Sequence, residues 1–273
     1  MTRDQHPAFT AGGDDFVMAC AGDDCIKTGC GDDTIYAGAG NDKIYAGSGN
    51  DTIYTGLGAD YVDGSCGYDT VSYEHSQEAV DASLNCCVTG KGGDAEGDRL
   101  CSVEHLIGSD FDDVLRDGCG ANLIEGGKGN DTIYIDCSDV AYGGECNDTF
   151  IIDSAYTDGI HGGEGYDTIQ FGYTGYLDMT SYCAPDVSSI EMVDMTDGGW
   201  CSDTLYLDKN AVDSMTDNDL LYVQGDNNDR VVLEGEGSWY NSVDWTLDGQ
   251  DTVTVSNLFQ KHNHLFLKAF NVS

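Results

Sequence analysis

The sequence predicts an all-β fold built from stacked coils, and three observations lead to this prediction. Aspartate recurs every nine residues from Asp15 to Asp69. An aliphatic residue follows each of these aspartates by two positions, and a glycine precedes each of them by two positions. A nine-residue unit with one core-facing side chain cannot bury that side chain by itself, so neighbouring units must stack on one another.

Composition restricts the classes of function. The 273 residues include 11 Lys+Arg and 50 Asp+Glu, for a formal charge of −39 at pH 7. This charge excludes nucleic acid or anionic lipid as partners bound through electrostatic attraction. Forty of the acids are Asp and 37 residues are Gly, so turn-forming residues dominate and helix is disfavoured. No apolar run has the length of a membrane span, and residues 1–20 lack the apolar core of a secretory signal.

The first array of repeats runs unbroken from Thr10 to Ser72. After each aspartate, three residues point out, in and out, as in Lys43-Ile44-Tyr45, which is the pattern of a very short β-strand. The glycine two positions before each aspartate is expected to adopt a positive φ, which a Cβ atom would disfavour. The metal ligands predicted in this array are Asp15, Asp24, Asp33, Asp42, Asp51, Asp60 and Asp69.

Two repeats are expected to form one coil of 18 residues, so residues i and i+18 lie one strand spacing apart, about 4.8 Å. The first column then contains Asp15, Asp33, Asp51 and Asp69, and the second column contains Asp24, Asp42 and Asp60. Carboxylates at this spacing repel by about 1–3 kcal/mol per pair, so the chain is not expected to fold until a cation neutralises them. Ca²⁺ suits such a site because it accepts about 6–8 oxygen ligands in tolerant geometry, whereas Mg²⁺ demands a tighter octahedron.

The units GAGNDKIYA, GSGNDTIYT and GKGNDTIYI resemble the GGxGxDxUx nonapeptide of RTX (repeats-in-toxin) proteins, a calcium-binding β-helix repeat. The resemblance covers most of residues 10–172 and implies a right-handed parallel β-roll, or β-solenoid. It also implies Ca²⁺ ions between the turns of repeats that are two units apart. The implied sites span Asp15/Asp33, Asp33/Asp51, Asp51/Asp69, Asp24/Asp42 and Asp42/Asp60.

The repeat pattern divides the chain into five segments. These are an N-terminal lead (1–9), the first calcium-binding array (10–72), an intervening β segment (73–107), a second, irregular array (108–172) and a β-rich C-terminal segment (173–273).

The second array is less regular than the first. Its predicted metal ligands are Asp113, Asp131, Asp139, Asp148 and Asp167. Asn122 stands where a further aspartate is expected, and Asp139 follows Asp131 by eight residues instead of nine. Cys146 replaces the glycine that precedes Asp148, and a Cβ atom there should strain the turn. Fewer or weaker ions are therefore expected in this array.

The C-terminal segment alternates apolar and polar residues between turn signals, which indicates an antiparallel or continued β region. It resembles the C-terminal part of long bacterial RTX surface proteins. The tail HNHLFLKAFNVS is compatible with the uncleaved signal that a type I secretion apparatus reads in that family. The resemblance thus implies a protein outside the cell or on its surface, which folds on external calcium and has a cell-surface or glycan target as a candidate partner.

Twelve cysteines are unusual for such repeats. Cys101, Cys119 and Cys137 are spaced by 18 residues, a separation at which stacked neighbours could form disulfides. Unpaired thiols at small-residue positions are the favoured interpretation.

No catalytic residue is predicted, because the sequence contains neither an HExxH zinc motif nor a GxSxG nucleophile elbow. The leading hypothesis is a non-enzymatic calcium-binding protein. The alternatives are a calcium-dependent enzyme that modifies polysaccharide or protein, and a surface-layer or fibre component. Outward-facing Tyr36, Tyr45 and Tyr54 are interpreted as stacked β-formers on a solvent face rather than as a ligand platform.

Overall fold

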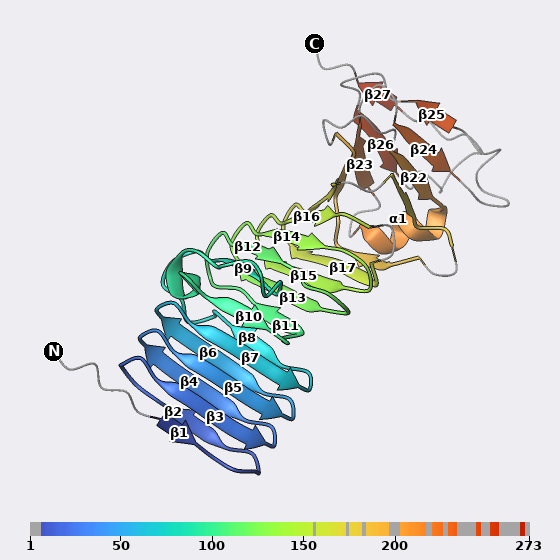
Figure 1. Ribbon diagram of the computed structural model, residues 1–273. Coiled ribbons are helices and arrows are strands. Elements are labelled where there is room, and N and C mark those ends of the chain that lie inside the picture. Colours follow the sequence, from blue (N-terminus) through green and yellow to red (C-terminus); the bar gives the residue numbers. More distant parts are fainter. Residues whose placement is uncertain are drawn as a thin grey trace. The chain divides into compact units, whose positions relative to one another are not determined.

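The computed structural model describes residues 7–154, 157–172, 175–181, 184–196, 203–216, 220–225, 229–233, 244–246, 252–256 and 268–270. The chain divides into two compact units, Met1–Ile133 and Tyr134–Ser273. Short strands dominate both units, and the described residues contain one α-helix, α1 (Lys209–Met215), and one 3₁₀ turn, η1 (Gly93–Ala95) (Figure 1). The sheets are mainly parallel, so the prediction of an all-β parallel roll is confirmed.

The strands of the first unit are short because each one crosses the roll once before a turn (Figure 1). One sheet contains β1 (Pro7–Phe9), β3 (Cys25–Cys30), β5 (Lys43–Ser48), β7 (Tyr61–Cys66) and β10 (Arg99–Cys101), in that order. The opposite sheet contains β2 (Phe16–Met18), β4 (Thr34–Ala39), β6 (Thr52–Leu57), β8 (Thr70–Ser72), β11 (His105–Ile107) and β13 (Leu123–Lys128). A third pair, β9 (Asp81–Ser83) and β12 (Val114–Arg116), is also parallel.

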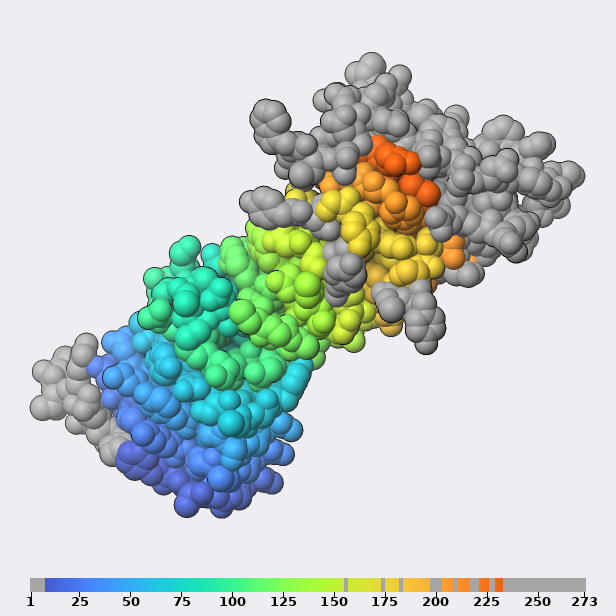
Figure 2. Space-filling view, turned by 45° about the vertical axis from the view of Figure 1, so that its right-hand side comes forward, coloured from blue at the N-terminus to red at the C-terminus, as the bar shows by residue number. Residues whose placement is uncertain are grey.

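The register of the first array is the predicted one. Ile26 pairs with Ile44 and Ile44 with Val62, each 18 residues further along the chain. These three side chains are fully buried, and they alternate with outward-facing residues along each strand. The core is therefore a stack of single aliphatic side chains, one from each repeat. Figure 2 shows the successive coils of this unit as adjacent bands that follow chain order from blue to green.

The turn glycines adopt the predicted conformation. All seven glycines that stand two residues before a column aspartate have positive φ: Gly13, Gly22, Gly31, Gly40, Gly49, Gly58 and Gly67. A second set ends the strands, and a Cβ atom on Gly47 of this set would overlap the carbonyl oxygen of Gly29 in the preceding coil. Cys146 keeps a positive φ of 85° without being glycine, so its turn retains the repeat conformation under strain.

The intervening segment extends the roll instead of dividing it. After β8 the chain leaves the coils at Tyr73, forms β9 and η1, and returns as β10, which pairs in parallel with β7. The next strand, β11, pairs in parallel with β8. The sheets that contain β7 and β8 therefore each gain a strand from beyond the insertion.

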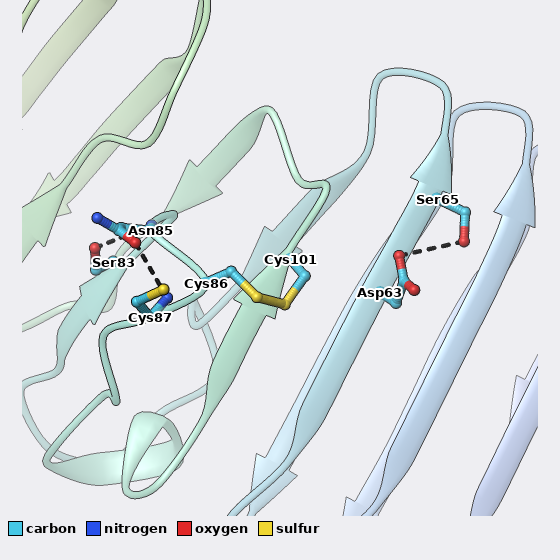
Figure 3. Close-up of a disulfide and its surroundings, with 7 residues drawn as sticks. All are labelled: Asp63, Ser65, Ser83, Asn85, Cys86, Cys87 and Cys101. Carbon is cyan, nitrogen blue, oxygen red and sulfur yellow. Dashed lines mark hydrogen bonds between the residues drawn. A yellow bond between two sulfur atoms is a disulfide. The ribbon is translucent and has the colours of Figure 1, made fainter.

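A disulfide joins Cys86, which follows β9, to Cys101 in β10, with their Cα atoms 4.7 Å apart (Figure 3). The expectation of unpaired thiols is therefore wrong for Cys101. Its partner belongs to the insertion, which lies outside the 18-residue lattice, so the spacing of cysteines could not reveal it. The other cysteines among the described residues are free thiols: Cys20, Cys25, Cys30, Cys66, Cys87, Cys119, Cys137 and Cys146.

The second unit continues the same type of winding with a longer period. After β14 (Thr132–Ile135), its parallel sets are β15 (Val140–Glu145), β17 (Gly159–Glu164) and β20 (Asp186–Ser188); β16 (Thr149–Ile152), β18 (Thr168–Phe171), β21 (Met192–Asp194) and β23 (Leu220–Gln224); and β19 (Tyr176–Asp178), β22 (Thr204–Leu207) and β24 (Arg230–Leu233). Thr149 pairs with Thr168, which is 19 residues later. This offset absorbs the irregular spacing seen in the sequence.

The C-terminal segment is a continued parallel region up to β24. Antiparallel pairing enters with β25 (Asp244–Thr246), β26 (Thr252–Ser256) and β27 (Lys268–Phe270). The helix α1 begins at Asp208, whose carboxylate accepts a hydrogen bond of 2.7 Å from the backbone N–H of Ala211.

We expect Gly47→Ala to destabilise the calcium-loaded chain much more than Gly120→Ala. Both glycines have positive φ, 118° and 103°, so both variants incur backbone strain of about 1–2 kcal/mol. A Cβ atom on Gly120 has no atom within 4 Å, whereas one on Gly47 overlaps the coil beneath. Urea unfolding followed by circular dichroism measures the difference. Equal losses in the free energy of unfolding would show that the coils do not pack this closely.

Candidate functional site

The predicted ligands lie in the turns between strands, and most of them are buried. In the first array Asp24, Asp33, Asp42, Asp51, Asp60 and Asp69 are at most 2% exposed. Asp15 belongs to the first coil and is half-buried. In the second array Asp113, Asp131, Asp139, Asp148 and Asp167 are at most 1% exposed. Buried carboxylates are strongly unfavourable unless hydrogen bonds or cations compensate them.

One oxygen of each column carboxylate is satisfied by the coil before it. The Oδ1 atom of Asp33 accepts the backbone N–H of Asp15 at 2.8 Å, and that of Asp51 accepts the N–H of Asp33 at 2.8 Å. The same bond recurs at Asp42, Asp60 and Asp69. The columns expected from the spacing are thus hydrogen-bonded ladders that run through the turns.

The residue before each column aspartate forms a second ladder in the opposite direction. Asp14 accepts the backbone N–H of Asp32 at 3.0 Å, and Asp32 accepts that of Asn50 at 2.7 Å. Asp23, Asn41 and Asn50 behave in the same way. These residues were not predicted as part of the site, although the recurring Asp-Asp and Asn-Asp pairs were a visible signal. Each turn is therefore fixed from both sides by side-chain oxygens.

The second oxygen of the column carboxylates has no such partner. The Oδ2 atoms of Asp15, Asp33, Asp42, Asp51, Asp60 and Asp69 are buried and accept no hydrogen bond. A buried charged oxygen left in this state is costly. The glycines also bring backbone carbonyl groups of successive turns close together, as at Gly49 above Gly31 and Gly58 above Gly40. Carboxylate and carbonyl oxygens without nitrogen or sulfur form the donor set that Ca²⁺ prefers.

The second array differs in how its carboxylates are satisfied. Both oxygens of Asp113 are engaged, because they accept hydrogen bonds from the backbone N–H of Val80 and from the N–H and Oγ of Ser109. Asp139 accepts the N–H of Asp136 at 3.0 Å within its own turn. Past Cys146, the N–H of Asp148 still donates to Asp167 at 2.8 Å. The ladder thus persists in this array, although its donor sets are no longer uniform.

Burial and mutual repulsion oppose ionisation of the columns when no cation is present. Burial, followed by repulsion from Asp98, raises the pKa of Asp60 to about 8. Burial raises the pKa of Asp69 to about 6 and that of Asp98 to about 7. The pKa values of Asp42 and Asp51 are raised for the same first reason, with repulsion from Asp24 and Asp33 adding to it. A divalent cation would remove this penalty by compensating the ionised form.

Comparison with known proteins agrees with this geometry. The family model of the RTX calcium-binding nonapeptide repeat matches four copies, at residues 9–44, 28–62, 36–71 and 105–134. The chain is an RTX repeat protein. RTX nonapeptides bind Ca²⁺, and in this protein they supply the buried aspartates of the columns. No curated protein matches the chain.

Several acids outside the matched RTX repeats occupy column positions. Asp98 accepts the N–H of Asp60, Glu104 that of Asp69, Glu191 that of Asp167 and Asp229 that of Asp203. Sequence reasoning missed these four acids because they do not follow the nine-residue spacing. A signal was nevertheless available, since each is followed after one residue by a buried aliphatic side chain: Leu100, Leu106, Val193 and Val231.

We expect acid to favour the rolled state of the calcium-free chain. The pKa values of Asp60 and Asp98 are raised above the unfolded value of 3.8, so the folded state binds more protons. Folding is therefore favoured below that value and disfavoured as the pH rises through about 7 and 8. Circular dichroism in calcium-free buffer should show β signal increasing from about pH 9 to about pH 5.

Calcium should reverse this dependence, because protons compete with the ion for the carboxylates. The calcium concentration at the folding midpoint should rise as the pH falls. A calcium-free β signal that decreases on acidification, at pH values kept above the pI of 4.1, would contradict the raised pKa values.

Proposed function

We propose that the protein is a secreted calcium-switched protein whose RTX columns prevent folding where calcium is scarce and drive folding where it is abundant. The observation that carries this proposal is the row of buried Oδ2 atoms that accept no hydrogen bond in the first array. Each bound ion stabilises the folded state by mass action, and several ions acting on one stack make the response steep.

Export by a type I secretion apparatus, and a place outside the cell or on its surface, form the cellular part of the proposal. RTX repeats are typical of secreted bacterial proteins, which supports it. Among the described residues, no helix combines the length and the apolar character needed to cross a membrane. The tail that resembles a secretion signal, residues 262–273, lies outside the described residues except for 268–270. A chain kept unfolded by low calcium would suit passage through such an apparatus.

We expect Asp33→Asn and Asp51→Asn together to raise the calcium concentration needed for folding by about tenfold or more. Asparagine keeps an oxygen that can accept the N–H of the preceding coil, so the change mainly removes charge from the ion sites. Circular dichroism during a calcium titration measures the midpoint, and magnesium serves as the ionic control.

The matched control for this titration is Asp63→Asn, which removes one charge from the outward side of β7. Its midpoint should stay close to that of the parent. If the double variant folded at the parent's calcium concentration, or if magnesium were equally effective, the proposed switch would be wrong.

A second candidate function, the binding of an acidic glycan, is favoured by the cations of the first unit. Among its described residues, Lys91 and Arg116 lie within ion-pair distance of Asp81, and Lys128 within that of Asp110. Lys27, Lys43 and Arg99 form no ion pair with a described carboxylate and are exposed. Three uncompensated cations on a chain of charge −39 are unexpected, because acids are abundant.

These three cations share the outer face of the β3-β5-β7-β10 sheet with tyrosine rings. Lys43, Tyr61 and Arg99 stand in register on consecutive strands. In the next row the Nζ of Lys27 lies 4.9 Å from the centre of the Tyr45 ring. Lys43 and Arg99 are two strand spacings apart, about 9.6 Å, a sparse distribution of charge compared with the dense phosphates of a nucleic acid. A carboxylated polysaccharide matches this face, since sugar rings can pack on the tyrosines while carboxylates reach the cations.

We expect Lys43→Ala combined with Arg99→Ala to weaken binding of uronic acid oligosaccharides by about tenfold, in line with two lost charge-assisted contacts. Isothermal titration calorimetry on the calcium-loaded chain measures the affinity, and neutral glucan oligosaccharides serve as the ligand control. Lys128→Ala should leave the affinity unchanged. Equal binding by the double variant and the parent would refute this function. Shortened or modified glycans in the mixture would support the enzyme alternative.

A further inference from the structure

The insertion ends at a junction, defined here as the place where β10 joins β7 and β11 joins β8. At this junction residues that are far apart in the sequence become neighbours in the sheets. Arg99 is aligned with Tyr61, and His105 with Thr70. The column positions across the junction are separated by 38 and 35 residues instead of 18. No RTX repeat is matched between residues 71 and 105.

Asp98 occupies the place in the second column that a regular repeat would fill. The N–H of Asp60 donates to its Oδ1 at 2.8 Å, and the N–H of Arg99 donates to the carbonyl of Asp60 at 2.8 Å. The regular rung below has the same two bonds, from Asp42 to Asp60 at 2.7 Å and from Tyr61 to Asp42 at 2.9 Å. The hydrogen bonding of the column therefore continues across the insertion without a change in pattern.

The carboxylates on both sides of this rung are buried. Asp60 and Asp98 are each 2% exposed, and the Oδ2 of Asp60 accepts no hydrogen bond. Tyr73, the first residue of the insertion, is buried and donates its hydroxyl to the Oδ2 of Asp98 at 2.9 Å. This bond fixes the orientation of the Asp98 carboxylate beside Asp60. The pair contains two acids without a described cation within ion-pair distance of either.

The first column continues through Glu104 in a similar way. The N–H of Asp69 donates to Oε2 of Glu104 at 2.9 Å, and the N–H of His105 donates to the carbonyl of Asp69 at 2.9 Å. Asp69 is fully buried, and its Oδ2 accepts no hydrogen bond. A glutamate thus performs at the junction the role that aspartate performs in the regular repeats.

We propose that the junction holds two calcium ions beyond those of the nonapeptide repeats, one between the turns of Asp60 and Asp98 and one between those of Asp69 and Glu104. Each site combines a buried carboxylate oxygen that lacks a hydrogen bond with a second acid in the position of the next repeat. The ions tie the insertion to the first array, because their ligands come from segments that only the folded insertion brings together. The interruption in the sequence is thus not an interruption in the row of ions.

The test counts the calcium ions bound to the full-length chain by native mass spectrometry. Asp98→Asn and Glu104→Gln should each remove one ion at a calcium concentration that saturates the parent, and the double variant should lack two. Both replacements retain an oxygen that can accept the backbone N–H, so they remove charge and leave the ladder bond available. Asp63→Asn, which removes a charge from the outward side of β7, should bind as many ions as the parent.

A parent-like ion count in both junction variants would overturn the proposal. Crystals of the parent grown with calcium give an answer that does not depend on how the variants fold. Anomalous difference density is expected between Asp60 and Asp98 and between Asp69 and Glu104, and its absence from both places would also overturn the proposal. A chain that folds on calcium but lacks these two ions would refute this inference alone, whereas a chain that does not fold on calcium would refute the proposed switch.

Discussion

The whole structure depends on one electrostatic constraint, which is that the turns bury rows of like charges that the protein satisfies only in part. Every column aspartate of the first array except Asp15 is at most 2% exposed, and backbone N–H groups compensate one oxygen of each pair. The other oxygen needs a partner that the first array does not contain as a side chain. Core residues such as Ile44 favour stacking of the coils, while the aspartates oppose it. Calcium decides the balance because it converts the opposing charges into ligands.

Much of the fold could be predicted from the sequence because the repeat constrains each level of structure. The nine-residue period determined the strands, the 18-residue register and the two columns, and the glycines before the aspartates indicated the positive φ. Cys146 shows why such a pattern tolerates exceptions. The turn at that position is fixed by neighbouring coils, so a non-glycine residue adopts φ 85° and the ladder between Asp148 and Asp167 persists.

The remainder could not be predicted because it depends on contacts that no fixed spacing encodes. Asp98 enters the second column only because β10 returns to β7 after an excursion, and the pairing of Cys101 with Cys86 follows from the same excursion. The 19-residue offset in the second unit was also hidden, since a single extra residue per coil blurs the period. The placement of the twelve predicted aspartates in turns is a matter of geometry. Their role as ligands stays a prediction for the individual residues.

The disulfide between Cys86 and Cys101 imposes an order of events on a chain that is exported unfolded, as we propose. It closes a covalent ring across a sequence separation of 15 residues. Such a ring cannot travel through a narrow conduit as a single extended strand, so the two thiols must remain reduced until that stretch has emerged. Oxidation would then make the return of β10 to the roll harder to undo, because loss of the ions would leave the ring intact. The protein would thus keep a covalent record of having once been outside.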